Sequence, residues 1–168
     1  DVAPFAPLYQ QLYFSFYENT LTLYRGQYPL FGDPQVLTHK VLWDYTFYWA
    51  LLAPLFYGGR IADVAMLGRV RATAQRAEAL NAAMQPLLRA WGARNAANGI
   101  DPAPRQPVPG GAPPMLDQQG VPWFREMNRA LSDTLDDDAF VARIQANVAR
   151  MAVLAAELLG YARAAHPG

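Results

Sequence analysis

The chain contains no cysteine. This absence excludes disulfide bonds, thiolate zinc sites, iron–sulfur clusters and cysteine-based catalysis. Histidine is nearly as scarce, and because His166 lies close to the C-terminus, His39 is the one candidate for a general base. A single histidine does not make a Ser-His-Asp set, and the Glu-x-x-His motif of di-metal helical bundles is missing. We therefore assign no catalytic residue and no metal ligand.

Charge is low and balanced. Charged residues make up 17% of the chain, and 14 basic residues face 14 acidic ones, so the formal net charge is zero. Without a basic excess there is no field that attracts phosphates, and we expect no nucleic-acid partner. The N-terminus lacks the basic and apolar segments of a secretion signal, which favours a cytoplasmic location.

No apolar run is long enough for a typical membrane span. The longest, residues 41–57, falls short of the roughly 20 residues required and includes Asp44 and Pro54. We interpret it as a buried helix and do not expect membrane contact, although its tryptophans and tyrosines are of the kind found at membrane interfaces.

Alternating strand patterns and internal repeats are also missing, whereas apolar residues recur at helical spacing. The sequence therefore predicts an all-α fold, a bundle of about four to five helices in a single domain over residues 1–168. The predicted helices are 4–25, 34–57, 60–92, 122–131 and 137–165. A Pro/Gly-rich loop over 93–121 is expected between the third and the fourth of them.

Several boundaries follow from local signals. Asp33 before Pro34 is an N-cap followed by a proline at the first helical position. Pro54 is expected to kink or end the second helix. In the third helix, Pro86 predicts a kink or a break, and we expect Gly92 to lie near the end of this helix.

The N-terminal third is rich in aromatic residues and holds few charges. Such a segment must be covered by the chain's own helices, by a partner chain or by a flat organic ligand. An aromatic stripe at helical spacing is more often plain core than a ligand pocket. The candidate substrate-binding residues are Tyr24, Arg25, Tyr28, Asp44, Tyr45, Tyr48 and Trp49.

Asp44 is the most informative polar residue, because it lies on the inward stripe of its helix and a buried carboxylate is costly unless it is paired. Lys40 lies one turn earlier and Arg25 lies before the helix. The structural interpretation is an ion pair of Asp44 with one of these two cations. The functional interpretation makes Asp44 a polar anchor in an aromatic ligand pocket, and the sequence leaves both open.

The stretch Tyr24-Arg25-Gly26-Gln27-Tyr28-Pro29-Leu30-Phe31-Gly32, followed by Lys40-Val41-Leu42-Trp43-Asp44-Tyr45 and by Tyr48-Trp49, resembles the C-terminal helical part of the flavin-dependent tryptophan halogenases. The segments Leu116-Asp117-Gln118 and Pro122-Trp123-Phe124 are similar to the same region. The resemblance covers most of this chain but only about the last third of such a protein.

The resemblance implies a two-part enzyme, in which a part that binds FAD makes the oxidant and a helical part covers the organic substrate. The glycine-rich dinucleotide turn, the Trp-x-Trp-x-Ile-Pro motif and the reactive lysine of the flavin part are missing here, since Lys40 does not match the position of that lysine. No catalytic residue carries over, and this chain alone should bind no FAD and be inactive. The chain begins at Asp1 without an initiator methionine, which we interpret as a processed chain or a piece of a longer one.

Three hypotheses follow. In the first, the chain is a non-catalytic, substrate-covering domain of a halogenase-like or monooxygenase-like protein, and its partner is the flavin-binding part. In the second, it is a self-contained binding module with an aromatic pocket for a planar small molecule or a partner helix. The third and weakest is a stand-alone enzyme that uses His39, Glu18 and Asp44.

Overall fold

The computed structural model describes residues 6–99, 122, 126 and 135–164, and within residues 8–16 the only side chain that it describes is that of Gln10. The described residues are helical or lie in turns, and none of them forms a strand. The fold is therefore all-α, as the sequence predicts. Its elements are α1 (Ala6–Tyr24), a 3₁₀-helix η2 (Tyr28–Gly32), α2 (Pro34–Phe47), a π-helical segment η3 (Tyr48–Leu52), α3 (Ala53–Tyr57), α4 (Val64–Ala97) and α6 (Asp137–Ala164).

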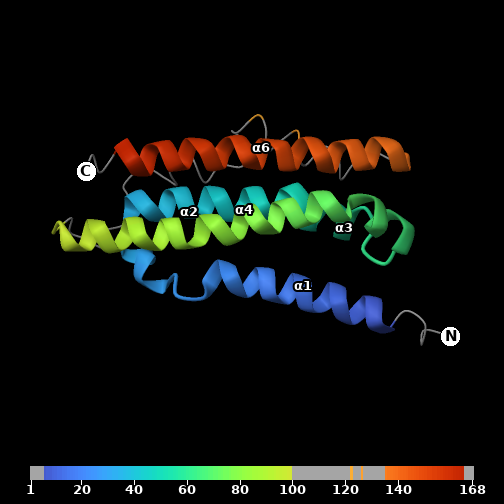
Figure 1. Cartoon of the computed structure of the whole chain (residues 1–168), viewed down its shortest axis with the longest axis horizontal. Coiled ribbons are helices and arrows are strands. Elements are labelled where there is room, and N and C mark those ends of the chain that lie inside the picture. Colours follow the sequence, from blue (N-terminus) through green and yellow to red (C-terminus); the bar gives the residue numbers. More distant parts are fainter. Residues whose placement is uncertain (1–5, 100–121, 123–125, 127–134, 165–168) are drawn as a thin grey trace, which may run out of the picture.

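The helices run side by side along one long axis (Figure 1). The continuous run α2–η3–α3 lies in the middle beside α4, with α6 on one side and α1 on the other. α1 and α2 run in opposite directions, whereas α4 and α6 run in the same direction. As a result, α4 ends and α6 begins at opposite ends of the bundle.

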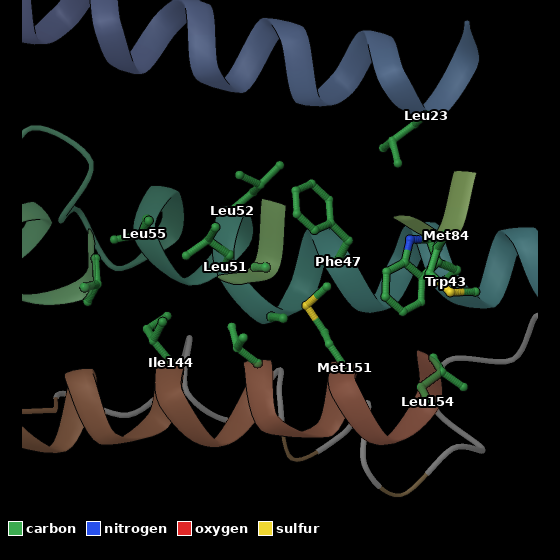
Figure 2. Packing of buried hydrophobic residues seen from close by; sticks show 14 of the residues in the cluster. Leu23, Trp43, Phe47, Leu51, Leu52, Leu55, Met84, Ile144, Met151 and Leu154 are labelled. Carbon is green, nitrogen blue, oxygen red and sulfur yellow. The ribbon is translucent and has the colours of Figure 1, made fainter. Parts of the chain in front are cut away.

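The main core forms where the middle layer meets α6. Trp43 and Phe47 are completely buried, and Figure 2 shows Ile144, Met151 and Leu154 pointing from α6 toward the central run. On the other side of that run, Leu23 reaches in from the end of α1. Burial of each such apolar side chain contributes about 1.5–3 kcal/mol, so this layer supplies much of the driving force for folding.

The start of α2 is the N-cap that the sequence predicts. Asp33 Oδ1 accepts hydrogen bonds from the backbone N–H groups of Gln35 and Val36 at 3.0 and 3.1 Å. The other carboxylate oxygen, Oδ2, accepts from Asn95 Nδ2 on α4 at 2.7 Å. Asp33 therefore both starts α2 and joins it to the far end of α4.

Replacing Asp33 by alanine is expected to lower the free energy of unfolding by about 1–2 kcal/mol, because the first turn of α2 loses its cap. Urea denaturation measures this loss. Asp33→Ser is the matched control, since serine retains a capping oxygen but does not reach Asn95, and it should cost clearly less than alanine. Equal losses for the two variants would show that the cap contributes little.

The helix does not end at Pro54 but continues to Tyr57. Proline has no N–H to donate to the carbonyl four residues earlier, and its ring crowds that carbonyl. Immediately before it, the backbone widens into η3, where the Ala53 N–H bonds to the Tyr48 carbonyl five residues back. The wider π-helical turn is how this chain carries a proline inside a helix.

The predicted break at Pro86 is wrong, because α4 continues through Pro86 to Ala97. Pro86 is exposed, so the carbonyl that it leaves unpaired can bind water. The predicted end near Gly92 is also wrong. A Cβ at Gly92 would overlap the Leu30 side chain, so glycine is present there for close packing of α4 against η2.

The remaining boundaries differ less. α4 begins at Val64 behind an Asp63 N-cap, so residues 60–63 are not helical, and residues 93–97 of the predicted loop belong to the helix. The rest of that loop, from residue 100, lies outside the described residues. Of the predicted helix 122–131, only residues 122 and 126 are described, and both are helical. α1 and α6 lie within the ranges predicted for the first and last helices.

Candidate functional site

The predicted site residues come from two parts of the chain. Tyr24, Arg25 and Tyr28 lie at the turn between α1 and α2, where all three side chains are exposed. Asp44 and Tyr45 lie on α2, and Tyr48 and Trp49 begin η3. Tyr45 and Tyr48 are exposed, whereas Asp44 and Trp49 are half-buried.

Lys40 is the ion-pair partner of Asp44. Its ammonium nitrogen lies 2.5 Å from Asp44 Oδ2, one helical turn away, and the side chain is only 2% exposed. Arg25, the other candidate cation, instead lies 3.8 Å from Glu18 on the surface. Lys40 also donates a hydrogen bond of 2.7 Å to the Leu23 carbonyl in the last turn of α1. A cation at a helix C-terminus is favourable, so Lys40 ties the end of α1 to α2.

The pair belongs to a larger hydrogen-bonded group. Gln85 Nε2 on α4 donates to Asp44 Oδ1 at 3.2 Å and to Asn81 Oδ1 at 3.0 Å. Asn81 Oδ1 also accepts from the Trp43 indole at 2.9 Å, and its amide donates to Thr22 Oγ1 at 3.1 Å. We call these six residues the Lys40 network: Thr22, Lys40, Trp43, Asp44, Asn81 and Gln85.

The Lys40 network joins α1, α2 and α4 through buried polar groups, which are stabilising only when they are paired. Burial raises the pKa of Asp44 above its ordinary value, against the opposing effect of the Lys40 ammonium and of the hydrogen bonds from Lys40 and Gln85. The surroundings of the Asp44 carboxyl group therefore disfavour its charged form. The geometry is that of a structural ion pair, which is the first of the two interpretations that the sequence left open for Asp44.

The turn that carries Tyr24, Arg25 and Tyr28 has a fixed backbone. On the α1 side of the turn, the Lys40 ammonium donates to the Leu23 carbonyl. Gly26 adopts φ +70°, a backbone conformation that residues with a side chain rarely adopt. Gln27 is fully buried, and its amide reaches the Gln85 carbonyl at 3.5 Å. The exposed side chains of this turn therefore project from a backbone that is anchored to α2 and α4.

The contacts between tyrosine, phenylalanine and tryptophan rings at the predicted site residues fall into two separate groups along the bundle. At the α1–α2 turn, Tyr28 packs edge-on against Phe31 at 5.6 Å. A second group begins one α2 length away, roughly 21 Å at 1.5 Å per residue, at the start of η3, and it extends to the end of α3. We call the second group the α3 aromatic cluster, and it consists of Tyr48, Trp49, Phe56 and Tyr57.

Sequence reasoning missed Asn81 and Gln85. Both lie on the inward face of α4, between the buried Ala77 and Leu88, and a polar amide at such a position is the signal that could have found them. It also missed Phe56 and Tyr57 as members of an exposed cluster. Their position beside Gly58 marked them only as the end of a helix.

Other features of the described residues do not add a reactive centre. No group of three or more His, Cys, Asp or Glu residues in the described ranges could hold a metal ion. A pocket of about 300 Å³ is lined by Arg150, Val153, Leu154 and Glu157, all on α6 and none predicted from sequence. α6 is also the one described helix long and apolar enough to cross a membrane, a property that it shares with core helices, and its inner face packs in the main core.

No family model, curated protein or solved structure matches the chain.

Proposed function

We propose that this chain is a non-catalytic helical domain that covers the organic substrate of a flavin-dependent halogenase-like or monooxygenase-like protein. In this proposal it docks on the flavin-binding part through the aromatic residues of its N-terminal third. Residues 1–168 form one domain, a bundle of about four to five helices in which a Pro/Gly-rich loop connects α4 to the later helices. The halogenase resemblance motivates the choice of partner.

The observation that carries the proposal is the exposure of aromatic rings. Among the described residues, eight of the eleven exposed large hydrophobic side chains are aromatic and fall between residues 17 and 57. Tyr28, at 69% exposed, stands beside the exposed Arg25 on the anchored turn. Tyrosine and arginine are the residue types that contribute most at protein interfaces, and a rigid turn loses little entropy when it binds.

FAD belongs to the partner in this proposal. A dinucleotide site of the usual kind needs a strand, a glycine-rich turn and a helix that directs its N-terminus at the pyrophosphate. The described residues contain no strand, and the sequence contains no Gly-x-Gly-x-x-Gly motif. The described residues therefore do not form a dinucleotide site of this kind, and we derive no chemical step through FAD. What this chain would contribute is enclosure of the substrate and exclusion of water.

The coding sequence upstream of Asp1 tests the assignment directly. An in-frame extension that encodes a Gly-x-Gly-x-x-Gly strand–turn–helix would support it. A stop codon followed by a ribosome-binding site just upstream would overturn it.

If the extension exists, the two parts can be expressed separately and their affinity measured by calorimetry. The double variant Tyr24→Ser/Tyr28→Ser should weaken binding at least tenfold, since loss of an interface hot spot costs about 2 kcal/mol or more. Tyr161→Ser is the matched control, because Tyr161 is equally exposed but lies on α6. An unchanged affinity of the double variant would show that the anchored turn is not part of the interface.

The second candidate function is a self-contained binding module. It is favoured by the chain's own core, in which Trp43 and Phe47 are fully buried. Saturable quenching of tryptophan fluorescence by small planar aromatics, lost in Trp49→Phe, would support this module. Linear quenching that is the same in both proteins would contradict it.

A further inference from the structure

The rings of the α3 aromatic cluster are arranged in two perpendicular orientations. Trp49 and Tyr57 are almost parallel, with an interplanar angle of 16° and centroids 6.4 Å apart. Tyr48 stands at 79° to Trp49, and Phe56 stands at 87° to Tyr57, with centroid distances of 5.4 and 5.3 Å. Phe56 and Tyr57 are 61% and 58% exposed, so two rings that stand at nearly a right angle to each other both reach solvent.

The cluster also lies at the negative end of a long helix. Residues 34–57 form one continuous helical run through α2, η3 and α3, and that run ends at Tyr57. Its aligned peptide dipoles place a partial negative charge at this end, which favours a cation. The last turn contains no basic residue.

The nearest cation of the following turn is directed elsewhere. Arg60 binds Asp137 Oδ1 at 2.8 Å and lies 5.9 Å above the ring of Phe140. It also lies 3.6 Å from Asp63 Oδ2. The Arg60 guanidinium therefore interacts with Asp63 and with the start of α6 rather than with the rings of the cluster.

Tyr48 of the cluster remains neutral near pH 7. Partial burial, and then a hydrogen bond and the charge interaction with Tyr57, raise the pKa of Tyr48 above its ordinary value of 10.0. A neutral ring presents the negative face of its quadrupole to a cation. The aromatic rings of the cluster and the negative end of the helix dipole therefore both favour a cation.

We propose that the α3 aromatic cluster is a binding site for a small organic cation that carries a trimethylammonium group. A bare ammonium would have to give up strong hydration at a half-exposed site, whereas an alkylated one is weakly hydrated and places methyl groups against the rings. Tyr48, Phe56 and Tyr57 also belong to the aromatic surface of the proposed docking. The binding of a small cation by the free chain does not require that docking, and the docking test at Tyr24 and Tyr28 does not change this cluster.

The test uses the whole chain and choline as the probe. Saturation-transfer NMR on the choline methyl signal detects binding, and a titration gives the affinity. The control ligand is the uncharged isostere of choline, with a tert-butyl group in place of trimethylammonium. Choline should bind about 2- to 30-fold more tightly than the isostere, the range expected for cation–π contacts. Equal affinities, or no saturable binding of choline, would overturn the proposal.

Variants localise the site. Phe56→Leu/Tyr57→Leu should abolish measurable choline binding, while Tyr57→Phe, which keeps the ring, should retain it. Tyr161→Leu serves as a control at an exposed ring on α6 and should bind like the original chain. Circular dichroism confirms that each variant folds. Unchanged binding by Phe56→Leu/Tyr57→Leu in a folded protein would refute the assignment.

The trimethylammonium group could belong to a free solute or to a lipid headgroup. Sedimentation with phosphatidylcholine vesicles separates these sources. Cosedimentation that is lost in Phe56→Leu/Tyr57→Leu would support the site with a lipid headgroup as its ligand. Choline binding without cosedimentation would support it with a free solute.

Discussion

Replacing Lys40 by methionine is expected to lower the free energy of unfolding by about 3 kcal/mol at pH 7, because it leaves a largely buried carboxylate without its cation. Asp44 is only 24% exposed, and the Leu23 carbonyl at the end of α1 loses its donor as well. The estimate lies at the lower end of the range for buried pairs because Asp44 retains some contact with water. Urea denaturation at constant ionic strength measures the loss.

The double variant Lys40→Met/Asp44→Leu provides the control. When both charges are removed together, no unpaired charge remains buried, so most of the stability should return. The difference between the double variant and the sum of the two single variants gives the coupling energy of the pair. If the double variant is as unstable as Lys40→Met, the ion pair is not what stabilises this junction.

The Lys40→Met variant also has a signed pH dependence. Burial already raises the pKa of Asp44 in the folded chain, and removal of the Lys40 ammonium removes an effect that lowers it. A group whose folded pKa lies above its unfolded value stabilises the fold at low pH, and that stability is lost as the pH rises through the folded pKa. The deficit of Lys40→Met should therefore shrink as the pH falls from 7 toward 4.

Trp43→Ala is expected to cost about 3–5 kcal/mol, the range for removing a large buried aromatic side chain. Trp43 is completely buried, and its indole N–H bonds to Asn81 at 2.9 Å. Trp43→Phe fills most of the cavity but loses this hydrogen bond, so it should cost about 1 kcal/mol or slightly more. Urea unfolding of the two variants separates packing from hydrogen bonding.

Tyr28→Ala is the comparison for the tryptophan series, because Tyr28 is aromatic but largely exposed. It should change the free energy of unfolding by roughly 0.5 kcal/mol, as expected of a surface substitution. A loss as large as that of Trp43→Ala would mean that the turn between α1 and α2 carries core stability. The interpretation of Tyr28 as an interface residue would then fail.

The sequence could predict the helices and the start of α2 because those features depend on local chemistry. Asp33 caps the two residues that follow it, and the stripe of α4 is a periodic pattern within one helix. The prediction failed at Pro86 and Gly92 because tertiary context decided both. Whether Pro86 faces water and whether Leu30 packs against Gly92 depend on elements distant in sequence.

The same distinction between local chemistry and tertiary context applies to the candidate site. Lys40 and Asp44 are one turn apart on one helix, so their pairing could be anticipated from spacing. The roles of Asn81 and Gln85 could not, since Gln85 meets Asp44, and Asn81 meets Trp43, only after α4 packs beside α2. Likewise, the grouping of Trp49 with Tyr57 depends on the π-helical turn between them, which no simple periodicity predicts.

The parallel course of α4 and α6 bears on how quickly the chain can fold. Arg69 on α4 and Asp138 on α6 form an ion pair across 69 positions of sequence, whereas the continuous run α2–η3–α3 is joined to α4 by the short segment 58–63. The ends of a long chain segment must come together before α4 and α6 can meet, and this loop closure costs conformational entropy before any contact forms. The rate-limiting barrier should therefore be the docking of α6 onto a preformed α2–α4 hairpin, with slower kinetics than an up-and-down bundle of equal length.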